Sequence, residues 1–399
     1  MERATWKGKA ARFLTAQTVS LFGSSLAQYA IVWYITLTTS SGLMLTLATV
    51  CGFAPQLLIS LFAGVWVDRY DRKRMILVAD AAIAAATLAL ALVFLFGYRS
   101  VWLLFAALLV RSAGTGVQTP AVGALLPQIV PQDRLMKVNG MHSTLSSLTT
   151  FLSPAVSGAL LSLAGMEAVL LADVVTAAFG IGVTATIAVP PHDKGGLRIA
   201  SSLDGVRQGF AYLRRRPFVR RLLAFQFAVL FLISPSAFMT PLLVSRTFGA
   251  EVWRLTASEM TFSAGAALGG LLIAGWGGFR SRMHTVLLAA ALYGALMLCL
   301  GAAPTFWLYL AANLLIGVTM PCYNAPVTVL LQEQVEPGMH GRVFSLLQIA
   351  TSCALPLGMV AFGPLADAAP VRALFVCAGL AVLAVVLAAF AGRWFTEAD

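Results

Sequence analysis

The sequence predicts an all-α polytopic membrane protein, with twelve transmembrane helices in two six-helix pseudo-repeats. Three observations support this prediction: the composition, the spacing of the apolar runs and the distribution of charge. Of the 399 residues, 59% are hydrophobic and 11% charged, and the mean hydropathy is +0.86. Soluble globular domains carry about a quarter of charged residues, so the composition excludes that class.

Apolar runs are spaced along the whole chain with short polar breaks between them. A helix that crosses a hydrocarbon layer of roughly 30 Å needs about 20 residues. The first run is too long for the core of a signal peptide and is followed by further runs, so we expect it to be retained. We expect the spans at residues 12–38, 43–67, 75–97, 101–127, 138–164, 168–189, 220–244, 256–276, 283–303, 305–331, 343–365 and 372–395.

The net charge of +11 is explained by topology and does not indicate a nucleic-acid partner. With a cytoplasmic N-terminus, most of the 27 Lys and Arg residues fall in inside loops, as the positive-inside rule requires. This bias places both termini in the cytoplasm. The exceptions are Arg99, Arg246, Arg254 and Arg372 outside and Arg111 within a span.

The chain is expected to divide into an N-terminal bundle (1–189), a cytoplasmic linker with an amphipathic helix (190–219) and a C-terminal bundle (220–399). A weak internal repeat crosses the linker at an offset of about 205 residues. It aligns residues 116–121 in the fourth span with residues 322–327 in the tenth. Two similar halves imply a substrate path at their interface, with rocking of the halves as the transport motion.

A dense charge cluster at residues 64–74, Gly-Val-Trp-Val-Asp-Arg-Tyr-Asp-Arg-Lys-Arg, separates the second and third spans. It resembles the cytoplasmic loop motif of the major facilitator superfamily, with Asp71 where that family usually has glycine. The resemblance implies a conformational gate in which Asp68 faces the N-terminus of the eleventh helix, a contact worth about 0.3 to 1 kcal/mol. A loop that only marks topology is the alternative. The gate residues are Gly64, Asp68, Arg69 and Arg72.

Arg111 is the one basic residue deep within a predicted span. Burying it unpaired costs at least about 2.5 to 3.5 kcal/mol, so we expect it to face a cavity or a partner. Residues 111–116, Arg-Ser-Ala-Gly-Thr-Gly, resemble the superfamily's fourth-helix motif of Arg followed by spaced glycines. An arginine that braces helix packing through backbone carbonyls is the alternative.

A degenerate proline motif lies in the fifth span, at Ser153, Pro154, Ser157 and Gly158. It resembles the Gly-Pro-x-x-Gly-Gly motif of the superfamily's antiporters, with serines replacing two glycines. Small residues here would let helices approach closely across the seam between the halves. An ordinary Ser-Pro kink is the alternative.

Polar residues recur every three or four positions in the first, fourth and tenth spans, and more weakly in the seventh. In lipid, such a face must turn toward protein or water. In the superfamily these four helices line the central cavity, and the nearby aromatic and sulfur side chains would make an adaptable apolar pocket. Interhelical hydrogen bonds without a ligand are the alternative. The candidate substrate residues are Gln28, Tyr29, Trp33, Thr115, Gln118, Gln226, Phe231, Asn313, Met320 and Asn324.

Proton-coupled export requires an acid whose surroundings change between states, and the polar stripes contain none. Asp80 and Asp173 are the intramembrane candidates. Asp80 is only about 9 Å from the cytoplasmic end of its span and could simply reach the surface, whereas Asp173 differs from Arg111 in depth by about 7 Å. Paired with Arg111, Asp173 would stay charged, and rocking could separate the pair so that a proton binds. A static brace, or two residues that never meet, is the alternative.

These motifs, together with Leu-Arg-Arg-Arg-Pro at 213–217, resemble the bacterial macrolide-efflux and siderophore-exporter branch of the superfamily. The resemblance implies a secondary active transporter rather than an enzyme, in the bacterial cytoplasmic membrane, exporting a bulky amphiphile by alternating access. The proton gradient would supply the energy without a cofactor or metal, and the partners would be a small-molecule substrate and the lipid bilayer, with the chain acting as a monomer. A metabolite facilitator or importer on the same fold, and a non-transporting scaffold or receptor, are the alternatives.

Overall fold

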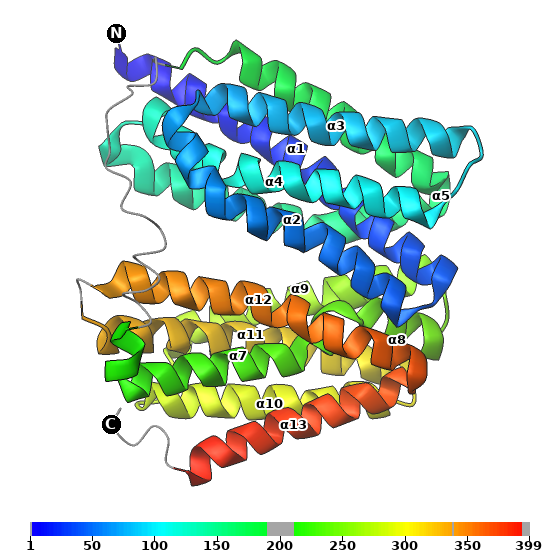
Figure 1. The fold of residues 1–399 in the computed structure, drawn as a ribbon, viewed down its shortest axis with the longest axis vertical. Coiled ribbons are helices and arrows are strands. Elements are labelled where there is room, and N and C mark those ends of the chain that lie inside the picture. Colours follow the sequence, from blue (N-terminus) through cyan, green and yellow to red (C-terminus); the bar gives the residue numbers. More distant parts are fainter. Residues whose placement is uncertain (1, 190–210, 337–338, 393–399) are drawn as a thin grey trace. The chain divides into compact units, whose positions relative to one another are not determined.

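The computed structural model describes residues 2–189, 211–336 and 339–392, which form helices joined by short turns (Figure 1). No β-strand occurs in these ranges. The chain divides into two compact units: unit 1 takes the described residues of 1–38 and 47–197, and unit 2 those of 39–46 and 198–399. The amphipathic linker helix predicted within 190–219 falls mostly outside the described residues.

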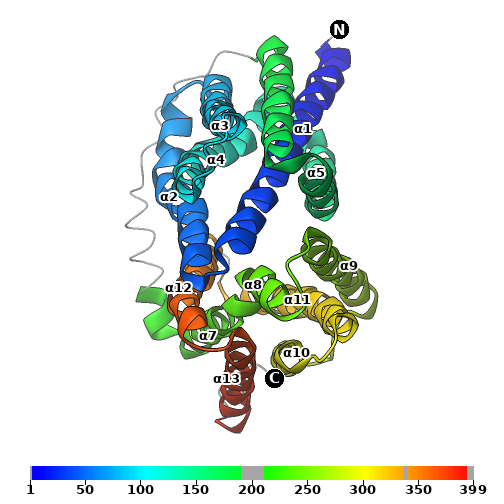
Figure 2. The same ribbon diagram turned by 90° about the vertical axis from the view of Figure 1, so that its right-hand side faces the viewer.

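Unit 1 is a helical bundle in which α3 packs against both α4 and α5. Figure 2 views the bundle roughly along its helices. The element α5 contains the fifth and sixth predicted spans, because two helices meet at Gly165, where φ is 82° and the helical path breaks. Its elements are α1 (Glu2–Thr39), α2 (Gly42–Arg69), α3 (Arg72–Leu95), α4 (Val101–Ile129), η1 (Gln132–Arg134) and α5 (Leu135–Thr186), except that residues 39–46, at the end of α1 and the start of α2, belong to unit 2.

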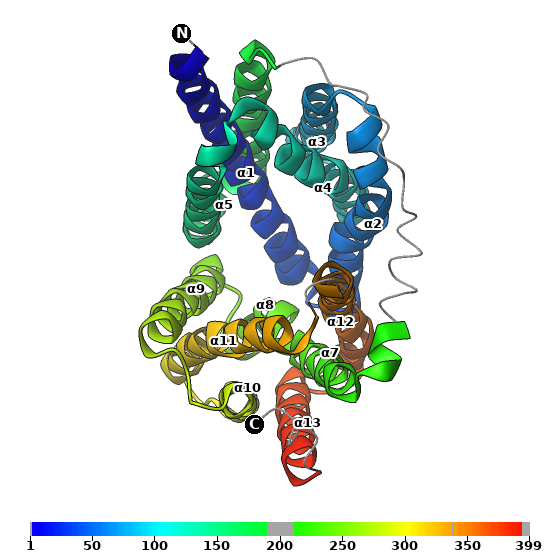
Figure 3. The same cartoon turned by 90° about the vertical axis from the view of Figure 1, so that its left-hand side faces the viewer.

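In unit 2, α11 packs against α9 and α10, α10 against α13, and α12 against α7 (Figure 3). The single span predicted at 220–244 is wrong in one respect, because the helix is interrupted at Met239. Pro241 lies two residues later, and proline has no N–H to continue the helical ladder. The elements are α7 (Pro217–Phe238), α8 (Thr240–Thr247), α9 (Val252–Trp276), α10 (Arg282–Ala302), α11 (Phe306–Gln334), α12 (His340–Ala368) and α13 (Val371–Ala391).

The described helices have the length and composition of membrane spans. Ten stretches are long and apolar enough to cross a bilayer, and one of them, Gln132–Thr186, includes both arms of α5. The 38-residue α1 is not among the ten. The fold is therefore that of an all-α polytopic membrane protein, as predicted.

The internal repeat predicted from the sequence has a counterpart in two helices. Both α4 and α11 have 29 residues, and both contain two prolines. They begin at 101 and 306 and end at 129 and 334, so both ends are offset by 205 residues. The two units thus use the same long, proline-bearing element.

Glycines let α9 and α11 approach one another at backbone distance. A Cβ atom added to Gly265 would lie 2.0 Å from the carbonyl oxygen of Leu314, and one added to Gly317 would lie 2.2 Å from that of Phe262. Small residues at such crossings bring helices together where lipid supplies no hydrophobic drive. Gly270, on the same helix, faces open space.

We expect Gly265→Ala to lower the free energy of unfolding by about 1 to 3 kcal/mol, because the added methyl group must push the α11 backbone away. Thermal unfolding of the purified protein in detergent measures this change. The matched control is Gly270→Ala, for which helix propensity predicts equal or higher stability. Equal melting temperatures for the two variants would contradict the close crossing.

Candidate functional site

A buried ion pair joins α4 to the second arm of α5 in unit 1. Nη1 of Arg111 contacts Oδ2 of Asp173, and the two residues are 5% and 0% exposed. The depths estimated from the sequence allowed this contact, and the structure confirms that the residues meet. Burying two charges is favourable only when hydrogen bonds satisfy their remaining polar atoms.

Hydrogen bonds from two more helices complete a charge cluster of Ser24, Thr87, Arg111 and Asp173. The hydroxyl of Ser24 on α1 donates to Asp173 Oδ1 at 3.1 Å, and Thr87 Oγ1 on α3 lies 3.0 Å from Asp173 Oδ2. Nη2 of Arg111 donates to the carbonyl of Ser24 at 2.9 Å, while Nη1 also contacts Thr87 Oγ1. Both carboxylate oxygens of Asp173 therefore have partners.

Two glycines let α1 and α5 approach closely enough for this cluster to form. A Cβ atom on Gly23 would lie 1.8 Å from Thr176 Oγ1, and one on Gly180 would lie 3.0 Å from the carbonyl oxygen of Ala16. Gly23 immediately precedes Ser24, so the close crossing is what places the serine hydroxyl against Asp173.

A second polar cluster consists of Gln17, Asp80 and Gln118. Nε2 of Gln118 donates to Asp80 Oδ1 at 3.0 Å and to Gln17 Oε1 at 3.2 Å. Asp80 is 3% exposed, so the expectation that it could reach the surface is wrong. The position of Asp80 along α3 did not predict its burial, because burial depends on the direction of the side chain, which points toward Gln118 of α4. Asp80 Oδ2 and Gln17 Nε2 have no hydrogen-bond partner in the structure.

The two clusters form one polar column along three helices. Each helix contributes one residue to each cluster, and the two residues are seven positions apart, which is two helical turns or about 10 Å. The Asp80 level lies nearer the α2–α3 loop and the Arg111 level farther from it. The pairs are Gln17 and Ser24 on α1, Asp80 and Thr87 on α3, and Gln118 and Arg111 on α4.

Two basic residues at the start of α3, Arg72 and Lys73, contact the ends of three other helices. Arg72 donates to the carbonyls of Val67 and Ala124 at 3.3 and 3.2 Å, near the ends of α2 and α4. Lys73 donates to two carbonyls at the end of α5. Cations at helix C-termini offset the helix dipole, so these two residues stabilise this end of the bundle.

Asp71, the departure from the family's loop motif, is the N-cap of α3. Its Oδ1 accepts from the Arg74 amide at 2.9 Å. Arg69 is exposed. The side-chain surroundings of Gly64 and Asp68 lie outside the described part of the chain, so the gate remains a prediction.

The proline motif packs within unit 1. Ser157 Oγ donates to the carbonyl of Leu26 on α1 at 2.9 Å, and Ser153 Oγ donates to Thr149 in its own helix at 2.7 Å. Pro154 and Gly158 are also buried. The contact that the structure shows is therefore with α1 of the same unit, whereas the sequence placed it at a seam between halves.

The predicted substrate residues differ in how far protein groups already engage them. Asn313 is 3% exposed and donates to the Ser258 carbonyl at 2.7 Å, which is an interhelical bond between α11 and α9. Trp33 is 1% exposed and contacts Tyr29, with ring centroids 5.6 Å apart. Gln226 is 3% exposed, and its Oε1 has no hydrogen-bond partner. The half-buried or exposed members are Gln28, Tyr29, Thr115, Gln118, Phe231, Met320 and Asn324.

Sequence reasoning missed an anchored turn in unit 2. Asp367, at the end of α12, accepts from the backbone amides of Gly42 and Leu43 at 2.7 and 2.9 Å and from Ser41 Oγ at 2.7 Å. Arg246 pairs with the same carboxylate at 3.0 Å. Two features of the sequence could have indicated this turn: Asp367 just after the span predicted at 343–365, and Ser-Ser-Gly just before the span predicted at 43–67. A carboxylate stabilises a helix N-terminus, so the two could have been paired.

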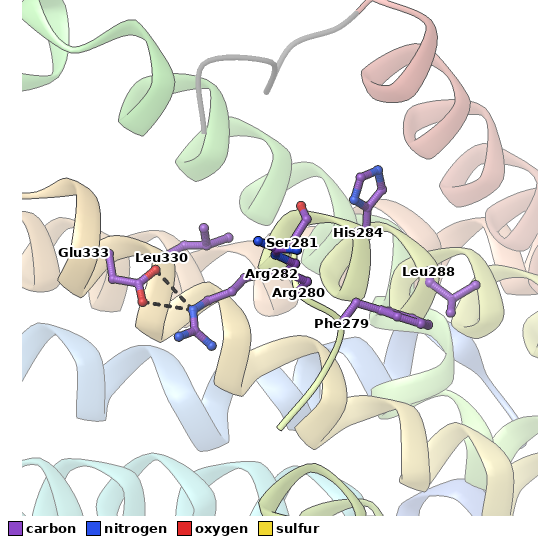
Figure 4. Close-up of a pocket in the computed structure, with 8 residues that line it drawn as sticks. All are labelled: Phe279, Arg280, Ser281, Arg282, His284, Leu288, Leu330 and Glu333. Atoms are coloured by element: carbon purple, nitrogen blue, oxygen red, sulfur yellow. Dashed lines mark hydrogen bonds and ion pairs between the residues drawn. The ribbon is translucent and has the colours of Figure 1, made fainter. Parts of the chain in front are cut away.

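Unit 2 also has a surface pocket at the α9–α10 connection, which Figure 4 shows. Nε of Arg282 donates to both oxygens of Glu333 at 2.9 and 3.1 Å, and Arg280 and His284 line the same pocket. None of the predicted substrate residues lines it. Its basic side chains suit an anionic group better than a bulky apolar ligand.

We expect Arg111→Met to cost about 3 to 5 kcal/mol of unfolding free energy, because Asp173 would remain charged and buried without its cation. The double variant Arg111→Met with Asp173→Leu should recover part of that loss. Thermal unfolding in detergent measures both. The control is Glu167→Gln, which breaks the exposed Arg99 pair of the same unit and should cost no more than about 1 kcal/mol. Equal losses for the buried and the exposed pair would contradict this assignment.

Three comparisons with known proteins agree with this architecture. The sequence profile of the Major Facilitator Superfamily matches residues 13–352. Macrolide efflux protein A of Streptococcus pyogenes is 31% identical over 389 residues, covering 96% of this chain and 95% of that protein. Multidrug efflux pump Tap of Mycobacterium tuberculosis is 25% identical over 401 residues, covering 96% and 93%.

Solved structures show the same fold at low sequence identity. A crystal structure of the nucleoside transporter NupG superimposes with a TM-score of 0.70 at 14% identity, covering 98% of this chain and all of that one. A bacterial homologue of the iron transporter ferroportin, in its inward-facing state, gives a TM-score of 0.69 at 16% identity, covering 97% and 98%. The chain therefore belongs to the Major Facilitator Superfamily, as a membrane transporter related in sequence to macrolide and multidrug efflux proteins.

Proposed function

We propose that this protein is a secondary active transporter that exports a bulky amphiphilic compound, such as a macrolide, in exchange for protons by alternating access. The observation that carries the proposal is the buried polar column of unit 1. It holds two carboxyl groups inside helices that are long and apolar enough to cross a membrane. Ionisable residues at such positions are costly and mark ion or proton pathways.

The substrate class rests on the macrolide efflux relative, whose similarity extends over 96% of this chain. The half-buried aromatic and thioether side chains Tyr29, Phe231 and Met320 support it. Phe231 stacks on Phe227, with ring centroids 6.5 Å apart, and contacts Phe362 at 5.9 Å. Such groups adapt to large apolar ligands, while amides such as Gln28 can bind the polar edge of an amphiphile.

The proposal includes the bacterial cytoplasmic membrane as location, with both termini in the cytoplasm, and a monomeric transporter. The charge distribution of the loops supports this orientation. In that orientation the α2–α3 loop is cytoplasmic, and Asp68 serves as the gate that favours the outward-facing state.

In everted membrane vesicles with an acidic interior, we expect radiolabelled erythromycin to accumulate against its concentration gradient. Dissipating the pH gradient with nigericin should release it, because proton flux would then no longer drive uptake. Vesicles lacking the protein provide the baseline.

Each alternative predicts a different outcome in the same vesicles. Flux that only equilibrates the compound, with or without a pH gradient, would indicate a facilitator and overturn proton coupling. No flux of any amphiphile in a panel, together with no thermal stabilisation by any of them, would overturn the transport proposal.

A further inference from the structure

The two buried carboxyl groups of unit 1 have very different surroundings. Both carboxylate oxygens of Asp173 have partners: one accepts a hydrogen bond from Ser24, and the other contacts Thr87 and Arg111. Asp80 accepts one hydrogen bond, from Gln118 to Oδ1, and its Oδ2 is buried without a partner. An unpaired carboxylate oxygen in an apolar interior loses its hydration without compensation.

The charges around Asp80 do not compensate its own. From α4, the nearest cation in the column is Arg111, two helical turns from Gln118. Arg111 already contacts Asp173, Thr87 and the Ser24 carbonyl. From α5, the acid is Asp173, which is already paired with Arg111 and so supplies no charge that would compensate Asp80. From α1, the neighbour is the uncharged amide of Gln17.

We propose that Asp80 is the carboxyl group that takes up and releases the coupled proton, and that the Arg111–Asp173 pair is a permanent brace. The inference rests on the proposed proton-coupled export and names the residue that carries it. It reverses the preference for Asp173 drawn from the sequence, because the structure gives Asp173 a full set of partners and Asp80 an incomplete one.

The proton exchange needs no other reactant. In the buried state, Gln118 donates to Oδ1, and the proposal assigns the proton to Oδ2, the oxygen without a partner. When the bundle opens this level to water, the O–H bond breaks, the proton passes to water and the Gln118 amide stabilises the carboxylate. Gln17 Nε2, in the same cluster, is also buried without a partner.

The test compares charge-removing variants in proteoliposomes. Asp80→Asn has the shape and charge of the protonated acid, so we expect normal folding and weaker substrate affinity, like that of the unmodified protein at acidic pH. Exchange of labelled for unlabelled substrate should persist at saturating substrate, while accumulation driven by a pH gradient falls to the passive level. The affinity for substrate should fall at acidic pH in the unmodified protein and become independent of pH in the variant. The controls are Asp133→Asn, an exposed acid, and Glu259→Gln, a half-buried acid of α9 in unit 2.

Coupled accumulation that persists in Asp80→Asn, or that is lost in Glu259→Gln instead, would overturn the assignment. Absence of gradient-driven accumulation in the unmodified protein would overturn the proposed function instead.

An infrared measurement is independent of transport. The C=O stretch of a protonated carboxyl should be present in the unmodified protein, absent in Asp80→Asn and shifted in Asp80→Glu, while Asp173→Asn should retain it. A band that disappears with Asp173 and not with Asp80 would contradict the inference.

Discussion

The ion pair of Arg111 and Asp173 is the interaction on which unit 1 depends. Removing two charges from water is unfavourable unless the geometry is good and every remaining polar atom is satisfied. Here the pair recruits a hydroxyl and a carbonyl from α1 and a hydroxyl from α3, so four helices share one hydrogen-bonded cluster. In a bilayer, where apolar surfaces gain little from associating, such polar contacts and close glycine crossings select one arrangement of helices.

The same column provides two chemical environments two helical turns apart. At the Arg111 level, both oxygens of Asp173 have partners and only Nε of Arg111 lacks one, which favours a fixed structure. At the Asp80 level, amides replace the guanidinium and two polar atoms remain unsatisfied. Buried polar groups without partners are uncommon in folded proteins, and binding a proton removes the buried negative charge at such a site. A rigid level beside a titratable level lets a bundle take up and release a proton while its helices stay packed.

Much of the fold followed from the sequence, because hydrophobic runs and charge placement are strong signals in membrane proteins. The pairing of Arg111 with Asp173 was one of the possibilities that the sequence allowed, since long side chains can bridge a depth difference of about 7 Å, and the structure confirms it. The burial of Asp80 did not follow from the sequence, because distance along a helix says nothing about which neighbour a side chain faces. Glu259 was not considered as an intramembrane acid, because it lies near the start of the span predicted at 256–276. The break at Met239 had a local signal in Pro241. The contacts of Asp367 with Ser41, Gly42 and Leu43 join residues more than 320 positions apart, so the sequence offered each signal separately but not their pairing.

The central claim is that an amphiphilic substrate and a proton bind to alternative forms of one protein. Calorimetric titration of the purified protein with a macrolide, in two buffers of equal pH and different ionisation enthalpy, tests it most directly. If substrate binding displaces a proton, the apparent binding enthalpy will differ between the buffers in proportion to their ionisation enthalpies. Identical enthalpies in the two buffers, with clear binding in both, would contradict the claim.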